Sequence, residues 1–567
     1  GSECDLEPII KPLNKGESYD SLIKDFSNYA TSYWKANGHQ WSMGDTWVPR
    51  SLRKLNYHFT TKTGPNGHAL WTALLDLIAI KDTPVFDALK ILVGPKASIM
   101  DTLVKWLGLL QNIFPEWFIS HSVQKYGIRA RKISYFPDKE LKVRVIAIGD
   151  YFSQCVLKPL HSFLFKFLAT IPQDHTHNQG GFKTLMVNNK SKEKFCSADL
   201  SAATDRFPIE VICTVLEGRL PPAWVKAWKT VMIGLPFSSH EGDISYSVGN
   251  PMGFYSSWAS FAVAHHFIIY YICMKLGLNW RTLEYALLGD DIVIKNDRVA
   301  KEYIRIMTIL GVEVSVLKTH DSHHFFEFAK RLFYKNEEIS PFPISALQAI
   351  HNKYYLLVSL LVELEEKGWK PQKSIPVSVS EFAKTVLHRK AKNCSDWEEY
   401  SWGVEHIIKV MRGTSSGGVF MTEYAAKVGF PQFKPFSDQE ADAMLSNIAV
   451  ELFSTSNPSS KEFQEKSKVP LGELATSWVL KLTDLTNSED CEVAMAAFDL
   501  IYAIPQVRGY GTIEETYMRL IREARHIDTH GGNWPKILRT MALPLDDRIF
   551  VQRTSHMISK GAALLSK

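Results

Sequence analysis

Two adjacent aspartates between two short apolar runs are the residues of this chain whose types and spacing point most directly to chemistry. Gly289, Asp290 and Asp291 separate Tyr285–Leu288 from residues 292–294. Both runs are too short for helices and are rich in Leu, Ile and Val, so the pattern predicts a β-hairpin with the carboxylates at its tip. Adjacent carboxylates repel each other, and a divalent cation relieves that repulsion. Two such cations can hold the attacking and leaving oxygens of an in-line phosphoryl displacement.

The same three residues also have an ordinary structural interpretation. Gly and Asp are common turn residues, and average residue usage gives Gly-Asp-Asp by chance in roughly one chain in ten of this length. The metal-site interpretation therefore requires a further carboxylate, a site for ribose and cations for a triphosphate elsewhere in the chain.

A second acidic segment, KFCSADLSAATDRFP, occupies residues 194–208. It predicts a strand over residues 195–200 and a helix whose first turn contains Pro208. Asp199 then lies near a strand end, where it can share cations with Asp290 if this strand lies beside the hairpin. Asp205 is too far along the chain for the same ion, but it could accept a hydrogen bond from a ribose hydroxyl. N-capping of the following helix is its alternative role.

A glycine-rich loop and a long apolar helix lie between these two segments. Asn250 belongs to the loop GNPMG, which starts at Gly249 and whose two glycines let the backbone approach a ligand closely. The helix predicted after the loop runs to Gly277, and Ser256 and Ser257 in its first turn are candidates for hydrogen bonds to a sugar or base. A buried helix that starts after a Gly-Pro loop is the alternative.

Cations cluster upstream, in residues 127–144 (GIRARKISYFPDKELKVR). Alternation places Lys142 and Arg144 on the same face of a predicted strand, and paired cations on one face suit a triphosphate or pyrophosphate. A further lysine, Lys62, belongs to an early turn-forming loop. For any single one of these cations a solvated basic surface is the alternative.

Two more strands are predicted after the hairpin. Residues 311–318 form a strand pattern that ends in Lys318, and a lysine near a leaving phosphate could act as a general acid. Residues 325–333 (FFEFAKRLF) predict another strand, which carries Lys330 and Arg331. A surface position is the default expectation for each of these cations.

Composition describes a large globular protein. The 567 residues are 45% hydrophobic and 12% aromatic, enough for several subdomains, and the net charge of +5 means that a polyanion would be held by local basic patches. Seven cysteines without a C-x-x-C pair argue against a zinc knuckle or a disulfide framework and fit a reducing compartment. The longest apolar run, residues 261–274, is too short to span a bilayer and contains His265 and His266, which we expect to be packed or exposed and not metal ligands. Stable membrane insertion is not expected.

The order of these six segments favours the chemical interpretation. Each segment has a purely structural alternative, and it is improbable that all six alternatives hold together in this order. The series resembles the palm motifs of viral RNA-dependent RNA polymerases. More narrowly, DLSAATDRFP, GNPMGFYSSWA, YALLGDDIVI, FEFAKR and KTGPNG are similar to motifs of the mitovirus polymerases, which are related to those of narnaviruses, ourmia-like viruses and RNA phages. The resemblance runs from about Lys62 to Arg331.

This resemblance implies an α+β fold. It would be a right-hand polymerase with fingers, a palm built on an antiparallel sheet with flanking helices, and a mostly helical thumb. The implied boundaries are residues 1–195 for the N-terminal region and fingers, 196–343 for the palm with a fingers insertion near 214–246, and 344–567 for the thumb and C-terminal region.

The resemblance also implies an activity, replication of a viral RNA genome by an RNA-directed RNA polymerase. The 3′-hydroxyl of the growing RNA would attack the α-phosphate of an NTP, helped by two Mg²⁺ ions or by Mn²⁺ in their place. The implied roles are metal ligation by Asp199 and Asp290 with Asp291 in support, ribose selection by Asp205 with Ser256 or Ser257, triphosphate contacts from Lys142 and Arg144, proton donation by Lys318, a template contact from Asn250 where relatives usually carry Gln, and RNA contacts from Lys62, Arg129, Arg131, Lys330 and Arg331.

RNA template, RNA product and NTPs are the implied partners of a monomeric polymerase core. The implied location is the host mitochondrion, or the cytoplasm if the chain is closer to narnavirus or ourmia-like relatives. Two alternatives stay open. A reverse transcriptase would share the palm carboxylates, although Asp205 favours ribonucleotides. A catalytically inactive, polymerase-like RNA-binding protein is the other, although Asp199, Asp290, Asp291 and Lys318 are all present.

Overall fold

The structure is a computed structural model, and it describes residues 5–39, 48–53, 63–69, 72–98, 100–101, 104, 107, 125–137, 143–177, 192–315, 320–335, 337–344, 346–348, 357–369 and isolated positions between 372 and 437. The described residues fall into two compact units. The first extends to Ala329 and the second begins at Lys330. The expected site lies almost entirely in the first unit.

A four-stranded antiparallel sheet carries the two acidic segments. Its strands, in spatial order, are β10 (His320–Ser322), β5 (Phe195–Ala198), β9 (Asp291–Ile294) and β8 (Tyr285–Leu288). β5 pairs with β9, and β9 pairs with β8 through a two-residue turn. The predicted hairpin is confirmed, and the strand that precedes Asp199 lies beside it as the metal-site interpretation requires.

The central helix of the first unit is α12 (Ser257–Leu276). Its side chains are buried all round, which is typical of a core helix and explains why apolar residues show no helical periodicity here. Gly277, with φ +70°, ends the helix as predicted. The prediction that this apolar segment is too short for a membrane span is wrong on length, because the helix extends beyond residues 261–274 and is long and apolar enough to cross a membrane. However, 83% of its most apolar 18 residues are buried inside the protein.

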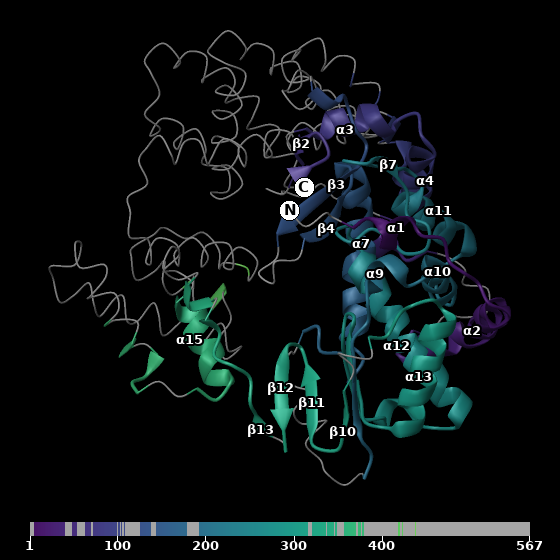
Figure 1. Cartoon of the computed structure of the whole chain (residues 1–567). Helices are drawn as coiled ribbons and strands as arrows, with labels where there is room; N and C mark the ends of the chain where they lie inside the picture. The colour runs from purple at the N-terminus through teal and green to yellow at the C-terminus, as the bar shows by residue number, and fades with distance from the viewer. Residues whose placement is uncertain are drawn as a thin grey trace. The chain divides into compact units, whose positions relative to one another are not determined.

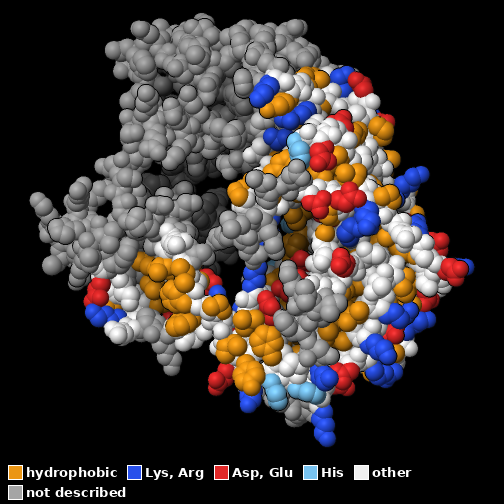
Figure 2. All heavy atoms as spheres, in the orientation of Figure 1, with side chains coloured by type: hydrophobic (Ala, Val, Ile, Leu, Met, Phe, Trp, Pro, Cys, Tyr) orange, Lys and Arg blue, Asp and Glu red, His pale blue; other side chains and the backbone are white. Residues whose placement is uncertain are grey.

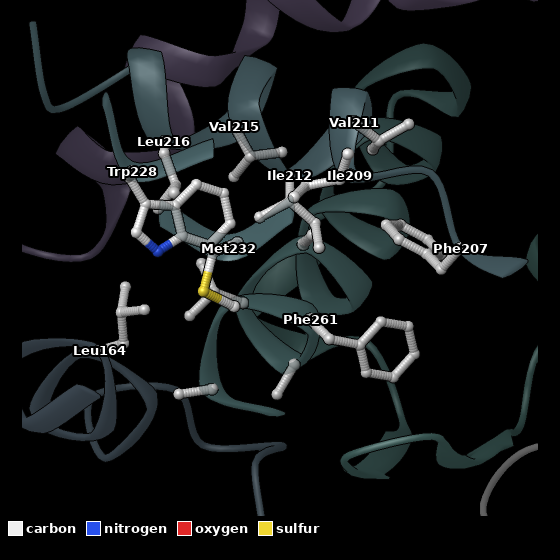
Figure 3. Packing of buried hydrophobic residues seen from close by; sticks show 14 of the residues in the cluster. Leu164, Phe207, Ile209, Val211, Ile212, Val215, Leu216, Trp228, Met232 and Phe261 are labelled. Atoms are coloured by element: carbon white, nitrogen blue, oxygen red, sulfur yellow. The ribbon is translucent and has the colours of Figure 1, made fainter. Parts of the chain in front are cut away.

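Besides the short helix at residues 203–206, four longer helices pack around α12, as Figure 1 shows. They are α2 (Glu17–Ala36), α7 (Tyr151–Leu168), α10 (Ile209–Glu217) and α13 (Asp297–Ile309). Figure 3 shows part of the resulting core, where the ring of Phe261 on α12 points toward that of Phe207, with ring centroids 5.1 Å apart. Burial of this apolar surface fixes α12 beneath the sheet that carries the aspartates.

A second sheet is built from the basic segment and a later hairpin. Its strands, in spatial order, are β4 (Val143–Ile148), β3 (Lys132–Pro137), β6 (Phe237–Ser239) and β7 (Gly242–Ile244). β3 and β4 pair antiparallel, whereas β3 and β6 are parallel at Lys132 and Ser238. Residues of the expected fingers insertion near 214–246 therefore extend the basic hairpin into a sheet. α11 (Pro222–Ile233) from the same segment packs on α4 (Pro84–Val93).

The single strand predicted over residues 325–333 is wrong. The structure has β11 (Phe325–Phe328) and β12 (Arg331–Tyr334), separated by Ala329 and Lys330 with φ of +53° and +60°. Two successive residues in the left-handed region reverse the chain, and no glycine or asparagine marks this turn in the sequence. The strand predicted over residues 311–318 is described only to Ser315, and within that part Val314 forms a single bridge with Leu200.

In the second unit, β12 pairs with β13 (Glu337–Glu338), and α15 (Leu357–Glu366) follows. Most of the expected thumb lies outside the described residues, so its helical character and the boundary near residue 343 stay predictions. Helices together with separate, mostly antiparallel sheets confirm the α+β class for the part of the chain that the structure describes.

Candidate active site

The turn between β8 and β9 presents Asp290 and Asp291. Leu288 and Asp291 are the last paired residues, so Gly289 and Asp290 form the turn. Gly289 has φ +62°, which fits the first central position of a type II′ hairpin turn and is strained for residues with a Cβ. A Cβ at this position would also lie 2.6 Å from Nε1 of Trp258. Backbone conformation and packing therefore both require glycine here.

Asp199 continues β5 toward this turn. Ala198 pairs with Ile292, so the next residues along the two antiparallel strands are Asp199 and Asp291. Directly opposite residues of an antiparallel pair have side chains on the same face of the sheet. The register thus brings Asp199 closest to Asp291, while Asp290 is exposed at the tip of the turn.

The carboxylates influence one another. Burial, together with the negative charges of Asp290, Glu327 and Asp199, raises the pKa of Asp291 to about 6. Oδ2 of Asp291 accepts one hydrogen bond, from the backbone N–H of Ala329 at 3.1 Å, which opposes that rise only in part. Like charges that lie near one another are stabilised by a cation.

The chemistry of this donor set fits a divalent cation, since Mg²⁺ and related ions prefer carboxylate oxygens. In the part of the chain that the structure describes, no three Asp, Glu, His or Cys side chains already surround a point where an ion could bind. Direct ligation by Asp199 and Asp290, with Asp291 in support, therefore stays a prediction.

α12 holds the turn from within the core through His265. Nδ1 of this buried histidine lies 2.8 Å from the carbonyl oxygen of Gly289, and Nε2 lies 2.6 Å from the hydroxyl of Tyr303 on α13. A carbonyl only accepts, so Nδ1 carries the hydrogen and Nε2 accepts from the tyrosine. Burial lowers the pKa of His265 to about 3, so the ring is neutral at physiological pH and keeps this arrangement.

The next residue of α12, His266, holds the other end of the same hairpin. Its Nδ1 lies 2.7 Å from the hydroxyl of Tyr285 at the start of β8, and its Nε2 lies 2.8 Å from Oδ2 of Asp174. The chain around Asp174 bridges the edge of β8, where the backbone N–H of His175 donates to the carbonyl of Leu287 at 3.1 Å. Both histidines are packed side chains that position the hairpin. The sequence indicated this role only through their adjacent positions in the apolar helix.

The glycine loop is tied down inside the protein. The Oγ of Ser257 donates to Oδ1 of Asn250, and both residues are buried. Ser256 has φ +71°, and its buried Oγ accepts a hydrogen bond from Nε1 of Trp228 at 3.0 Å. The three polar side chains expected to contact sugar, base or template are thus engaged with protein groups here. Their contacts with substrate stay predictions and require an exchange of partners.

Asp205 lies in the short helix α9 (Ala203–Arg206). The next helix begins only after its N-cap residue Pro208, so N-capping by Asp205 is wrong as an alternative. Burial raises the pKa of Asp205 to about 6. The glycine loop lies directly on α9, because a Cβ on Gly249 would come within 2.2 Å of the carbonyl oxygen of Thr204. The structure therefore brings Asp205 and the glycine loop together.

The basic segment is anchored by Asn66, a residue whose role the sequence did not reveal. Its Nδ2 donates to the carbonyl of Arg129 at 2.8 Å and to Oδ1 of Asp76 at 2.7 Å, and its Oδ1 accepts from the N–H of Arg129 at 2.8 Å. Asn66 and Asp76 are both buried. The motif KTGPNG therefore positions the basic segment, and the presence of a small polar residue between two glycines was its only signal.

The predicted cations have different surroundings. Arg131 is 1% exposed and donates to the carbonyls of Val231 and Met232 at the end of α11, which speaks against its expected RNA contact. Arg144 is exposed on β4. Arg331, in the second unit, pairs with Glu338. Lys62, Lys142 and Lys318 lie outside the described residues, so the expected pairing of Lys142 with Arg144 on one strand face is not tested.

Figure 2 shows acidic and basic side chains interspersed over the described part of one face, in keeping with the small net charge.

Residues 50–402 match the family model described as mitovirus RNA-dependent RNA polymerase. The chain belongs to this family. A mitovirus RNA-dependent RNA polymerase was the family indicated by the order of the motifs, and that resemblance is confirmed.

Relatives of this family member include viral and plant proteins. It is 32% identical over 324 residues to the RNA-directed RNA polymerase of Cryphonectria parasitica mitovirus 1, an alignment that covers 56% of this chain and 40% of that protein. It is 35% identical over 201 residues to an uncharacterized mitochondrial protein of Arabidopsis thaliana, which covers 34% of this chain and 78% of that protein. The solved RNA-dependent RNA polymerase of a human picobirnavirus aligns with a TM-score of 0.36 and 14% identity over 50% of this chain and 65% of that one.

Proposed function

We propose that this chain catalyses RNA-directed RNA polymerisation, with RNA template and product and NTPs as its partners. Family membership supports this, and the observation that carries it is the register of β5 with β9, which sets Asp199, the residue directly after β5, beside the Gly-Asp-Asp turn. Two acidic segments about ninety residues apart are thereby brought to the same end of the two central strands of one sheet. That arrangement is the one a metal-dependent nucleotidyl transfer needs.

In the proposed reaction, the 3′-hydroxyl of the growing RNA attacks the α-phosphate of an NTP. Asp199 and Asp290 would hold divalent cations, Mg²⁺ or Mn²⁺, with Asp291 in support, and these ions when bound supply charge stabilisation for the nucleophile and for pyrophosphate. Lys318 would donate a proton to the leaving pyrophosphate. Lys142 and Arg144 would contact the triphosphate. RNA contacts are proposed for Lys62, Arg129, Lys330 and Arg331.

Asp205 is proposed to select ribonucleotides. The backbone of Asp205 lies against the glycine loop. Its carboxylate would accept a hydrogen bond from a ribose 2′-hydroxyl, helped by Ser256 or Ser257 once they exchange partners. The proposed measurement compares incorporation of rNTPs and dNTPs on RNA and DNA templates by the wild type and by Asp205→Ala. Loss of discrimination in the variant is expected. Preferential use of dNTPs by the wild type would favour a reverse transcriptase instead.

The central test is the substitution Asp290→Asn in the full chain, with Asp243→Asn as the matched control. Asp243 is an exposed aspartate of the β6–β7 hairpin, away from the Gly-Asp-Asp turn. We expect Asp290→Asn to abolish product formation from an RNA template and NTPs without lowering thermal stability or RNA binding, and Asp243→Asn to behave like the wild type. Full activity of Asp290→Asn would contradict the proposal. A wild-type chain that binds RNA but forms no product with Mg²⁺ or Mn²⁺ would favour an inactive RNA-binding relative.

We also propose a right-hand layout, in which the sheet of β10, β5, β9 and β8 belongs to the palm and the sheet of β4, β3, β6 and β7 belongs to the fingers. Mitochondrial location is supported by a mitovirus relative and by two relatives from Arabidopsis thaliana that carry the description of mitochondrial proteins. A monomeric core is proposed as well. We also propose that the chain has no stable membrane insertion, because α12, which is apolar enough for a span, is buried in the core.

A further inference from the structure

A row of aromatic and basic side chains leads along α7 to the Gly-Asp-Asp turn. α7 contributes Lys158, His161 and Phe165, whose spacing places them on one helix face. Tyr255 comes from the short segment between the glycine loop and α12, and Trp258 comes from the first turn of α12. These five residues are called the aromatic strip below.

Ring contacts make the aromatic strip continuous. The ring of His161 lies 5.2 Å from that of Tyr255 and 4.2 Å from that of Phe165, measured between centroids. Phe165 and Trp258 are stacked, with centroids 5.5 Å apart and ring planes at 22°. Nζ of Lys158 lies 5.8 Å from the centre of the Tyr255 ring. The aromatic strip is therefore a row of rings with a cation at one end.

The other end of the aromatic strip lies at the candidate active site. The indole of Trp258 lies so close to the turn that a Cβ on Gly289 would come within 2.6 Å of its Nε1. The same side chain is 37% exposed, although it starts a helix whose other residues are almost all buried. An aromatic surface is thus accessible directly beside the proposed catalytic carboxylates.

Charge around the aromatic strip suits a polyanion. α7 contains two lysines and no carboxylate, and residues 249–283, which include the glycine loop and α12, contain no Asp or Glu. A phosphate backbone that follows the row of rings would therefore meet little repulsion until it reaches the turn, where the proposed cations are expected. Aromatic faces combined with a cation that follows the backbone are typical of surfaces that bind single-stranded nucleic acid without regard to sequence.

We propose that the aromatic strip binds single-stranded RNA, with Trp258 as the stacking platform for the base nearest the Gly-Asp-Asp turn and Lys158 as a phosphate contact. The inference rests on the proposed function for the identity of the ligand. The competing explanation is that these rings only pack α7 against the glycine loop. That explanation does not require an exposed tryptophan, since a buried aliphatic residue would serve the same packing.

The test measures binding of a short labelled RNA to the full chain by fluorescence anisotropy, in EDTA and without nucleotide, so that it does not depend on catalysis. Loss of stacking on one aromatic side chain lowers affinity by about 5- to 150-fold. We expect Trp258→Leu to weaken RNA binding by a factor within that range, and Trp258→Phe to retain most of the wild-type affinity. Thermal denaturation of both variants checks the fold. Binding by folded Trp258→Leu that equals the wild type would overturn the proposal.

Lys158→Gln tests the end of the aromatic strip that is remote from the Gly-Asp-Asp turn. Loss of one phosphate contact lowers the slope of log affinity against log salt by about 0.7 for single-stranded nucleic acid. The matched control is Lys275→Gln. Lys275 lies at the end of α12 opposite Trp258 and pairs with Asp25, so we expect no change in the salt dependence of RNA binding. An unchanged slope in Lys158→Gln, together with equal losses in the two Trp258 variants, would overturn the proposal in favour of simple packing.

Failure of this inference and failure of the proposed function give different results. If the wild type forms no product yet Trp258→Leu still weakens RNA binding, the aromatic strip stands and the polymerase proposal fails. If polymerisation is confirmed but Trp258→Leu changes neither RNA affinity nor the KM for RNA, the polymerase proposal stands and the aromatic strip fails.

Discussion

Replacement of Asp291 by asparagine is expected to stabilise the fold at neutral pH while it impairs the proposed activity. In the chain without bound metal, burial and the charges of Asp290, Glu327 and Asp199 raise the pKa of Asp291 from 3.8 to about 6. One pKa unit corresponds to about 1.4 kcal/mol, so ionised Asp291 destabilises the fold by up to about 3 kcal/mol relative to its protonated form. The substituted side chain would keep the hydrogen bond from Ala329, because an amide oxygen also accepts.

The pH dependence of folding stability follows from which state, folded or unfolded, holds the Asp291 proton more tightly. The folded state keeps the Asp291 proton up to a pH of about 6, whereas the unfolded chain releases it near 3.8. The folded state therefore binds more protons between these values, and stability falls as the pH rises through this window. Below the window both states are protonated and the substitution changes little. Above it, Asp291→Asn gains the full difference.

The assay is thermal denaturation of wild type and Asp291→Asn in EDTA from pH 4 to pH 8. The variant should gain a few degrees in Tm relative to the wild type as the pH rises to about 6, and a constant gain thereafter. Asp290→Asn is the matched control, because it removes a neighbouring charge from an exposed position and should give a smaller gain. Mg²⁺ should raise the Tm of the wild type more than that of Asp291→Asn. A Tm difference that does not vary with pH would refute the reasoning.

Three further substitutions follow from buried contacts. His265→Leu leaves the carbonyl of Gly289 and a tyrosine hydroxyl without their partner, so unfolding should become easier by about 2–5 kcal/mol, and the proposed turnover should fall even at temperatures where the variant is folded. Retention of wild-type Tm would contradict this role. Gly289→Ala combines a positive φ with a clash against Trp258, and we expect loss of product formation and a lower Tm; a fully active variant would show that the turn tolerates a Cβ. Asn66→Leu removes three hydrogen bonds, two of which hold the backbone of Arg129, and it should lower stability by about 2–4 kcal/mol and raise the KM for NTPs. An unchanged KM would limit Asn66 to a purely structural role.

The local features of the site could be predicted from the sequence. The turn at Gly289, the flanking apolar runs and the end of the central helix at Gly277 all depend on residues within a few positions of one another. Turn chemistry and hydrophobic pattern act over that range, so they are visible in one sequence. The turn at Ala329 and Lys330 escaped detection because neither residue favours positive φ, and contacts made elsewhere in the fold must hold it.

By itself the sequence determined the family and predicted which carboxylates form the site, because the order of the motifs and the residue types they carry are properties of the chain. The tertiary structure alone decided which residues face one another. Pairing of β5 with β9 brought Asp199 to Asp291, and packing of α12 beneath the sheet brought His265 to Gly289. Burial also changed Arg131 from a predicted RNA contact into an anchor for α11. Hydrogen bonds and burial between residues far apart in the chain depend on the packed core, and no local pattern encodes them.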